Sequence, residues 1–220
     1  MPAINWDKQK TKKHRYLVYG IPGVGKTTLS SFMKGKTYML SLDQSFYRIK
    51  FWQGKKDIWV IDPDQPIEDL TEFVKSFKPE NYDNLIIDNM SNFQKLWFAE
   101  KAKETKSGLD NKMSDYSEIN NYTIQFISKA FTWDLNILVT AWEKRDKVTD
   151  ANGQEFEQYA PDFRPDPRDF LMGNCDVVAR MIQKPQTGER GLIMQSDPGT
   201  YAKNRLDKRP GCKAEEFFND

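Results

Sequence analysis

The stretch RYLVYGIPGVGKTT, residues 15–28, decides the fold class of this chain. Residues 15–19 are mainly apolar and aromatic and end at a glycine, which predicts a buried strand. Residues 20–27 match the pattern G-x-x-x-x-G-K-[ST] at every fixed position, and residues 27–34 have the apolar spacing of a helix. A strand, a glycine-rich turn and a helix in this order predict a loop that binds phosphate groups.

The residue types of this loop suit a nucleoside triphosphate. Its glycines let the backbone curl, so that successive N–H groups and the start of the helix face phosphate oxygens. We expect Lys26 to bridge the β- and γ-phosphates, Thr27 to ligate Mg²⁺ and Thr28 to reach the α-phosphate of ATP or a close relative. The loop residues expected to bind the nucleotide are Gly20, Pro22, Gly23, Val24, Gly25, Lys26, Thr27 and Thr28.

Composition limits the possible functions. The chain has 220 residues, enough for one α/β domain, and 30% of them are charged. It has no apolar stretch of membrane-spanning length and no signal-peptide core at its start, so we expect a cytoplasmic protein without a membrane partner. The net charge is only +1, so a nucleic-acid partner would have to use local basic patches. The single His14 excludes a site built from several histidines.

The remaining pattern predicts an α/β fold with a mostly parallel central sheet flanked by helices. Further strands are predicted at 37–42, 58–61, 85–88, 135–140, 176–183 and 190–195, and the last strands are expected to extend the sheet as antiparallel neighbours. Further helices are predicted at 67–77, 93–106 and 116–131. Residues 144–170 predict a hairpin that turns at Asn152–Gly153, followed by an irregular segment. The core, 15–206, lies between a basic N-terminal arm, 1–14, and a C-terminal tail, 207–220.

Two carboxylates follow predicted strands. Asp88 ends the strand 85–88, and at that edge of the sheet it would hold the Mg²⁺ shell through water, together with Thr27. The alternative is an aspartate that caps the following helix. Many related ATPases have a glutamate directly after this aspartate, whereas residue 89 of this chain is Asn. The carboxylate that activates water must then come from elsewhere. Asp43, after the strand 37–42, is the candidate; a simple turn residue is the alternative.

Three segments carry a resemblance to RecA-type proteins. YMLSLDQSF, residues 38–46, resembles the segment in which RecA-type recombinases and DnaB-type helicases carry a catalytic glutamate, although Asp43 is one methylene shorter. YAKNR, residues 201–205, looks like the K-x-R element of hexameric motors, which implies that Lys203 and Arg205 reach a neighbouring subunit's γ-phosphate. A solvated basic tail is the alternative. By the same resemblance Thr140, in ILVTAWEK, is a γ-phosphate sensor.

The order of these motifs over residues 15–206 resembles a group of phage-encoded RecA-like P-loop ATPases allied to the Sak single-strand annealing proteins. The other segments that carry it are LIIDNMSNF, DYSEIN, CDVVARM and a glycine-turn hairpin leading to Ala160-Pro161-Asp162. The resemblance implies an ATPase acting on single-stranded DNA in phage recombination or replication. It also implies a homo-oligomeric ring or filament, and contact with other phage replication or recombination proteins in a host cytoplasm.

The residues themselves leave the partner open. Basic residues cluster at 8–15, 144–147 and 203–213. Aromatic residues that could stack on bases are Trp97, Phe98, Trp142, Phe156, Tyr159 and Phe163, although Trp97 and Phe98 fit a helix core better. We expect 144–165 to be the mobile DNA-contacting segment, with a plain solvated hairpin as the alternative. Other candidate functions are a replication or packaging motor or loader, and a small-molecule kinase with Arg164 and Arg168 in its lid.

Overall fold

β1 (Arg15–Gly20) lies in the middle of the sheet, between two parallel neighbours. The structure is a computed structural model that describes residues 13–149 and 152–219, so residues 1–12 of the expected basic arm lie outside it. Five of the six residues of β1 are buried, because the strand is covered on both faces. The apolar run before the glycine-rich loop is therefore a buried strand, as the sequence predicted.

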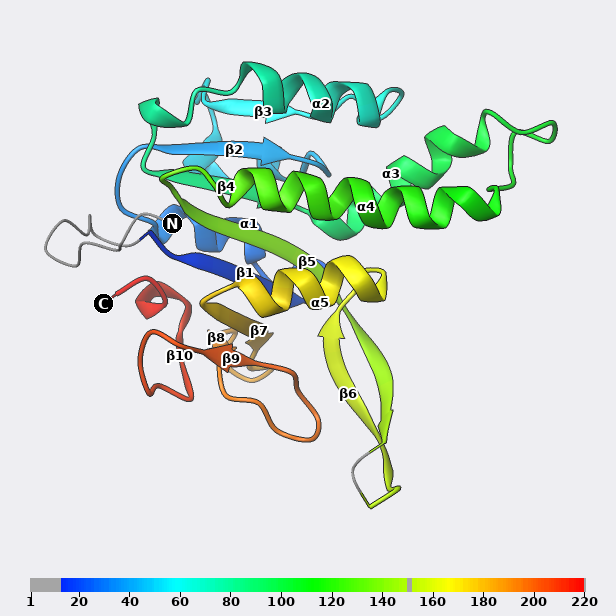
Figure 1. The fold of residues 1–220 in the computed structure, drawn as a ribbon. Helices are drawn as coiled ribbons and strands as arrows, with labels where there is room; N and C mark the ends of the chain where they lie inside the picture. Colours follow the sequence, from blue (N-terminus) through cyan, green and yellow to red (C-terminus); the bar gives the residue numbers. More distant parts are fainter. Residues whose placement is uncertain (1–12, 150–151, 220) are drawn as a thin grey trace, which may run out of the picture.

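The sheet is mostly parallel, as the sequence predicted. Its main order is β10-β8-β7-β1-β5-β4-β2-β3 (Figure 1). The parallel strands are β7 (Val177–Gln183), β1, β5 (Asn136–Thr149), β4 (Asn84–Asp88), β2 (Thr37–Ser41) and β3 (Ile58–Val60). Four strands pair in the antiparallel sense, namely β6 (Glu155–Pro161), β8 (Arg190–Ile193), β9 (Lys203–Asn204) and β10 (Gly211–Lys213). The carboxyl ends of the parallel strands share one edge of the sheet.

Each face of the sheet packs against a hydrophobic cluster. One face carries the longer helices, which are α2 (Pro66–Ser76), α3 (Met90–Ala102), α4 (Met113–Ala130) and α5 (Pro165–Asn174). The other carries shorter turns of helix, which are α1 (Lys26–Leu29), η2 (Ser30–Phe32), η3 (Ser45–Arg48), η4 (Lys50–Trp52) and η6 (Ala214–Glu216). A further 3₁₀ turn, η5 (Pro79–Asn81), precedes β4. Trp97 is buried in the first cluster, as its helical spacing predicted.

The segment after the hairpin differs from the sequence-based expectation. Residues 165–170, at the end of the segment predicted to be irregular, form the first part of α5. Pro165 occupies the first helical position and Pro167 the first turn, where an amide N–H has no partner within the helix. These prolines therefore start a helix and do not interrupt one.

Three other elements differ in extent. The predicted helix at 27–34 is shorter, because α1 ends at Leu29 and passes into a 3₁₀ turn. β5 continues beyond the predicted strand end at residue 140 and forms the expected hairpin with β6, which projects from the body of the molecule (Figure 1). Residues 207–220 include β10, which pairs with β8. In the part of the chain that the structure describes, no helix has both the length and the apolar character needed to cross a bilayer.

The packing of the face that carries the longer helices can be tested by a substitution at Phe73. Its side chain is fully buried, and its ring contacts those of Tyr38, Trp59, Phe77 and Trp133 at centroid distances of 5.0–6.2 Å. Because Phe73→Ala leaves a cavity among rigid rings, we expect it to lower the free energy of unfolding by about 3–5 kcal/mol in urea titration. Leu109→Ala, at a side chain that is 85% exposed, should change it by less than about 0.5 kcal/mol. A loss below about 1 kcal/mol for Phe73→Ala would contradict this packing.

Candidate functional site

The loop after β1 lies against neighbouring backbone, and two of its glycines make this possible. A Cβ atom on Gly20 would lie 2.6 Å from the carbonyl oxygen of Met181 in β7. Gly25 has a φ of +112°, and a Cβ atom there would lie 2.9 Å from Nε of Arg190. A side chain at either position would force the loop away from the sheet or strain its backbone. The glycine spacing is therefore a requirement of the fold as well as of a phosphate ligand.

A cavity of about 490 Å³ lies at the carboxyl edge of the sheet beside this loop. That volume is in the ordinary range of small-molecule sites. Lys26, Thr27, Asp43 and Asp88 all line it, although they follow three different strands. The structure thus brings together the lysine, the hydroxyl and the two carboxylates that the sequence singled out.

Lys26 is held inside the loop. Its Nζ donates hydrogen bonds to the carbonyl oxygens of Gly20 at 2.8 Å and Ile21 at 2.9 Å. Burial lowers the pKa of Lys26 to about 8, and the negative charges of Asp88 and Asp43 oppose this shift. A phosphate group in the cavity could replace the two carbonyl oxygens as the partner of this ammonium group. It would supply a negative charge, which the neutral carbonyl oxygens lack.

Asp88 is buried and surrounded by hydroxyl groups. Its Oδ2 accepts hydrogen bonds from Oγ1 of Thr27 at 2.7 Å and Oγ of Ser45 at 3.1 Å, and its Oδ1 accepts one from Oγ1 of Thr140. Burial raises the pKa of Asp88 and the charge of Asp43 adds to this, whereas the three hydroxyl donors oppose it. A carboxylate beside a threonine hydroxyl is a set of hard oxygen ligands that fits Mg²⁺.

Asp43 lines the same cavity in a more open setting. Its side chain is half-buried, and Oδ1 accepts a hydrogen bond from the backbone N–H of Ser45 at 2.9 Å. The strand before it, β2, pairs with β4 so that Ser41 lies opposite Asp88. This parallel register delivers both carboxylates to one edge of the sheet.

The other predicted residues of the loop have different positions. Pro22, Gly23 and Thr28 line the cavity with Gly25. The Val24 side chain is buried in the hydrophobic cluster on the α1 face, while its backbone N–H donates to the carbonyl oxygen of Ile21 at 3.3 Å. Val24 therefore does not line this cavity.

Lys203 and Arg205 lie at the opposite edge of the sheet. Lys203 in β9 pairs with Val178 near the start of β7, whereas the glycine-rich loop lies beyond the other end of these strands. The Lys203 ammonium group donates to the carbonyl oxygens of Met172 and Gly173, and Arg205 is exposed. Neither residue lines the cavity of its own chain.

The structure adds residues that the sequence did not indicate. Ser45 bonds to Asp88, and Arg48 and Arg190 line the cavity. The serine lies in the SLDQS segment, where its spacing from Asp43 was the available signal. Arg190 had no local signal, because it reaches the loop only through the pairing of β8 with β7.

The two arginines considered for a kinase lid are engaged elsewhere. Arg164 donates from Nε to Oδ1 of Asn120 at 2.7 Å, and the Arg168 guanidinium group pairs with Asp146 at the base of the hairpin. Their side chains thus tie α5 to α4 and to β5.

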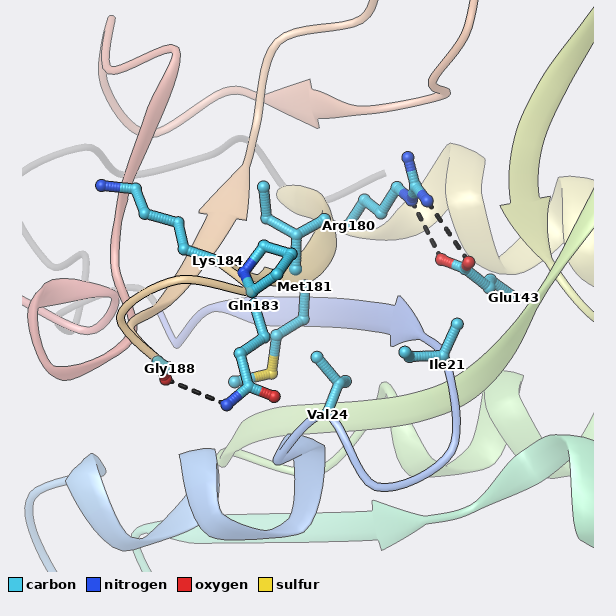
Figure 2. Close-up of a pocket in the computed structure, with 10 residues that line it drawn as sticks. Ile21, Val24, Glu143, Arg180, Met181, Gln183, Lys184 and Gly188 are labelled. Atoms are coloured by element: carbon cyan, nitrogen blue, oxygen red, sulfur yellow. Dashed lines mark hydrogen bonds and ion pairs between the residues drawn. The ribbon is translucent and has the colours of Figure 1, made fainter.

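A second cavity, of about 430 Å³, lies on the other side of the loop (Figure 2). Ile21 and Val24 form one wall and the turn between β7 and β8 forms another. On its rim Arg180 donates from Nε to Glu143 at 2.9 Å, and the Arg180 guanidinium group lies 3.3 Å from the ring centre of Tyr159. The Arg180–Glu143 pair therefore connects β7 with the base of the β5–β6 hairpin.

Comparison with known proteins agrees with this geometry. Residues 12–206 match the AAA domain family. The chain belongs to this family. Its fold is similar to that of the RadB recombinase, with a TM-score of 0.56 at 15% identity over 91% of this chain and 86% of that one. A KaiC-like protein from Pyrococcus horikoshii OT3 matches at 14% identity over 82% and 77% of the two chains, with a TM-score of 0.42.

No curated protein matches the chain. The family and the fold nevertheless agree with the expectation from the sequence. The protein is an AAA-domain nucleotide-binding protein with a RecA-like P-loop fold, in which a mostly parallel sheet carries antiparallel strands near the C-terminus.

The lowered pKa of Lys26 gives a pH test of the site. Between about 8 and the ordinary value of 10.5, the unfolded chain binds more protons at this residue than the folded chain. Rising pH should therefore stabilise the parent protein relative to Lys26→Met, by up to about 1.4 kcal/mol per pH unit in this window. Urea titrations of both proteins from pH 7 to 10 measure this difference. A difference that does not change with pH would contradict the buried position of the ammonium group.

Proposed function

We propose that this protein binds ATP with Mg²⁺ and hydrolyses it. The observation that carries the proposal is the 2.7 Å contact between the Thr27 hydroxyl and the buried Asp88 carboxylate, beside the glycine-rich loop. In a P-loop protein a threonine and an aspartate in this relation hold the metal that neutralises the β- and γ-phosphates.

The proposal assigns roles to the residues of the loop and to the side chains bonded around Asp88. Lys26 exchanges its bonds to loop carbonyls for bonds to the β- and γ-phosphates, and Thr27 ligates the metal. Asp88 holds the metal's water shell, and Thr140, which bonds to Asp88, responds to the γ-phosphate. The backbone of the loop from Gly20 to Thr28 binds the phosphate oxygens through its N–H groups.

Asp43 is the proposed general base. Asp88 is enclosed by three hydroxyl groups, whereas Asp43 is half-buried and faces the same cavity. It is therefore the carboxylate that can accept a proton from an attacking water molecule.

The substitution Asp43→Asn tests ATP hydrolysis separately from ATP binding. We expect hydrolysis to fall by about 10²-fold or more, because the amide cannot accept the proton, while the Kd for ATP changes little. Lys26→Ala is the matched comparison and should lose both, since it removes the ammonium group that contacts the phosphates. Phosphate release and calorimetric binding measure the two effects. Parental hydrolysis in Asp43→Asn would exclude Asp43 as the base.

We further propose that ATP use is coupled to single-stranded DNA, in the recombination or replication of a phage. One support is the path of β5, which runs without a break from Thr140 beside Asp88 into the projecting hairpin. The similarity to a recombinase structure and the motif order shared with the Sak-allied ATPases are the other supports. Such a protein would work in the host cytoplasm, alongside other phage replication or recombination proteins.

The hairpin would bind DNA mainly by stacking. Lys144 pairs with Asp146 at 3.2 Å and Arg145 with Glu157 at 3.2 Å, so acidic residues offset much of its positive charge. Tyr159 lies under Arg180 at the base, and Phe163 is buried in the core. Phe156, half-buried on β6 toward the tip, is therefore the best-placed aromatic residue for a base.

We also propose a homo-oligomeric ring or filament. Lys203 and Arg205 lie at the edge of the sheet opposite the loop, so they would act on a nucleotide only in a neighbouring copy. A head-to-tail contact of this kind produces rings or filaments. In that arrangement the two cations would stabilise the charge that develops on the transferred phosphoryl group.

The DNA proposal has a separate test. We expect single-stranded DNA to stimulate hydrolysis and to bind less tightly as salt increases. Phe156→Ala should weaken DNA binding about tenfold, because it removes one stacking surface, and should leave the Kd for ATP unchanged. Met113→Ala, at an exposed apolar residue of α4, is the control. DNA binding by fluorescence anisotropy that is absent at low salt, with hydrolysis intact, would remove DNA from the proposed function and leave the ATPase.

A further inference from the structure

A smaller cavity, of about 190 Å³, adjoins the phosphate cavity. The two cavities share Gly25, Thr28 and Arg190 in their walls. The smaller one extends from the loop along the outer side of α1 and η2, where Phe32 lines it. Glu215 of η6 closes it from the C-terminal segment of the chain. A ligand whose phosphates occupy the loop would thus find a second compartment next to Thr28.

Arg190 is at the junction of the two compartments, and one of its donor atoms lacks a partner. Its Nε atom is buried and, within residues 13–149 and 152–219, makes no hydrogen bond. The neighbouring Glu189 carboxylate is paired with Lys184 at 3.3 Å. A buried donor on a charged group is costly when it has no acceptor, so the Nε–H of Arg190 is suited to an acceptor atom of a ligand.

The walls of the smaller cavity suit a flat and largely apolar group. The Phe32 side chain is 40% exposed, so its ring is accessible to a ligand in this cavity. An aromatic ring and a planar guanidinium group are both surfaces on which a nucleobase can stack. Phosphate groups, by contrast, would gain nothing from Phe32.

We propose that the smaller cavity binds the base of the nucleotide and that Arg190 contacts its nucleoside part. This inference rests on the proposed function, since it places the base of the same ATP molecule whose phosphates occupy the glycine-rich loop. It also gives a role to the C-terminal segment: β10 pairs with β8 and brings η6 against α1, so residues after 206 complete the nucleotide site.

The test compares ATP with inorganic tripolyphosphate, which has the phosphate chain and no nucleoside. Equilibrium calorimetry with Mg²⁺ should show that the parent protein binds ATP more tightly than tripolyphosphate. Phe32→Ala and Arg190→Ala should each weaken ATP binding about tenfold, or 1.4 kcal/mol, and leave tripolyphosphate binding unchanged. Tyr116→Ala is the matched control, because Tyr116 is 39% exposed and lies on α4, and it should alter neither Kd.

The outcomes separate this inference from the proposed function. A parent protein that binds both ligands equally, or Phe32→Ala and Arg190→Ala variants with unchanged ATP affinity, would overturn the base site and leave the ATPase intact. Arg190→Ala that weakens both ligands to the same extent would make Arg190 a phosphate ligand and overturn its proposed role. A parent protein that binds neither ligand would overturn the proposed function and the base site together.

Discussion

The burial of the Asp88 carboxylate is the constraint on which the site depends. A buried carboxylate needs hydrogen-bond donors, and here three hydroxyl groups supply them. They come from Thr27 after the loop, Ser45 after β2 and Thr140 in β5. Because each donor belongs to a different element, satisfying one carboxylate fixes the loop relative to the neighbouring strands. The same bonds favour the charged form of Asp88 and oppose the effect of its burial, which raises its pKa.

The strands β1 and β5, which contribute residues to the site, also contact the base of the β5–β6 hairpin. β5 leads from Thr140 into the hairpin. At the base of the hairpin, Arg180 of β7 pairs with Glu143 and lies over the ring of Tyr159. The hydroxyl of Tyr19 in β1 donates to the carbonyl oxygen of Tyr159 at 3.0 Å, which ties the same base to the central strand. These contacts hold the base of the hairpin against β1 and β7.

The fold could be predicted from the sequence wherever the pattern was local. Buried parallel strands read as uninterrupted apolar runs, so β1, β2 and β4 were predicted close to their observed bounds. α5 was missed because Pro165 and Pro167 signal a break unless their place in the first helical turn is known. The outer part of β5 was predicted only as one arm of a hairpin and not as a continuation of the strand 135–140, because polar residues such as Lys144 and Asp146 interrupt the apolar run.

The sequence by itself determined the glycine-rich loop, its lysine and threonine, and the aspartates after two strands. These residues are adjacent to the elements that position them, so their spacing along the chain already specifies their place at the sheet edge. Only the tertiary structure decided that Ser45 bonds to Asp88, that Arg190 reaches the loop and that Arg205 lies at the opposite edge. The reason is physical: these positions follow from strand order and strand pairing, which join residues far apart in the chain and leave no local pattern.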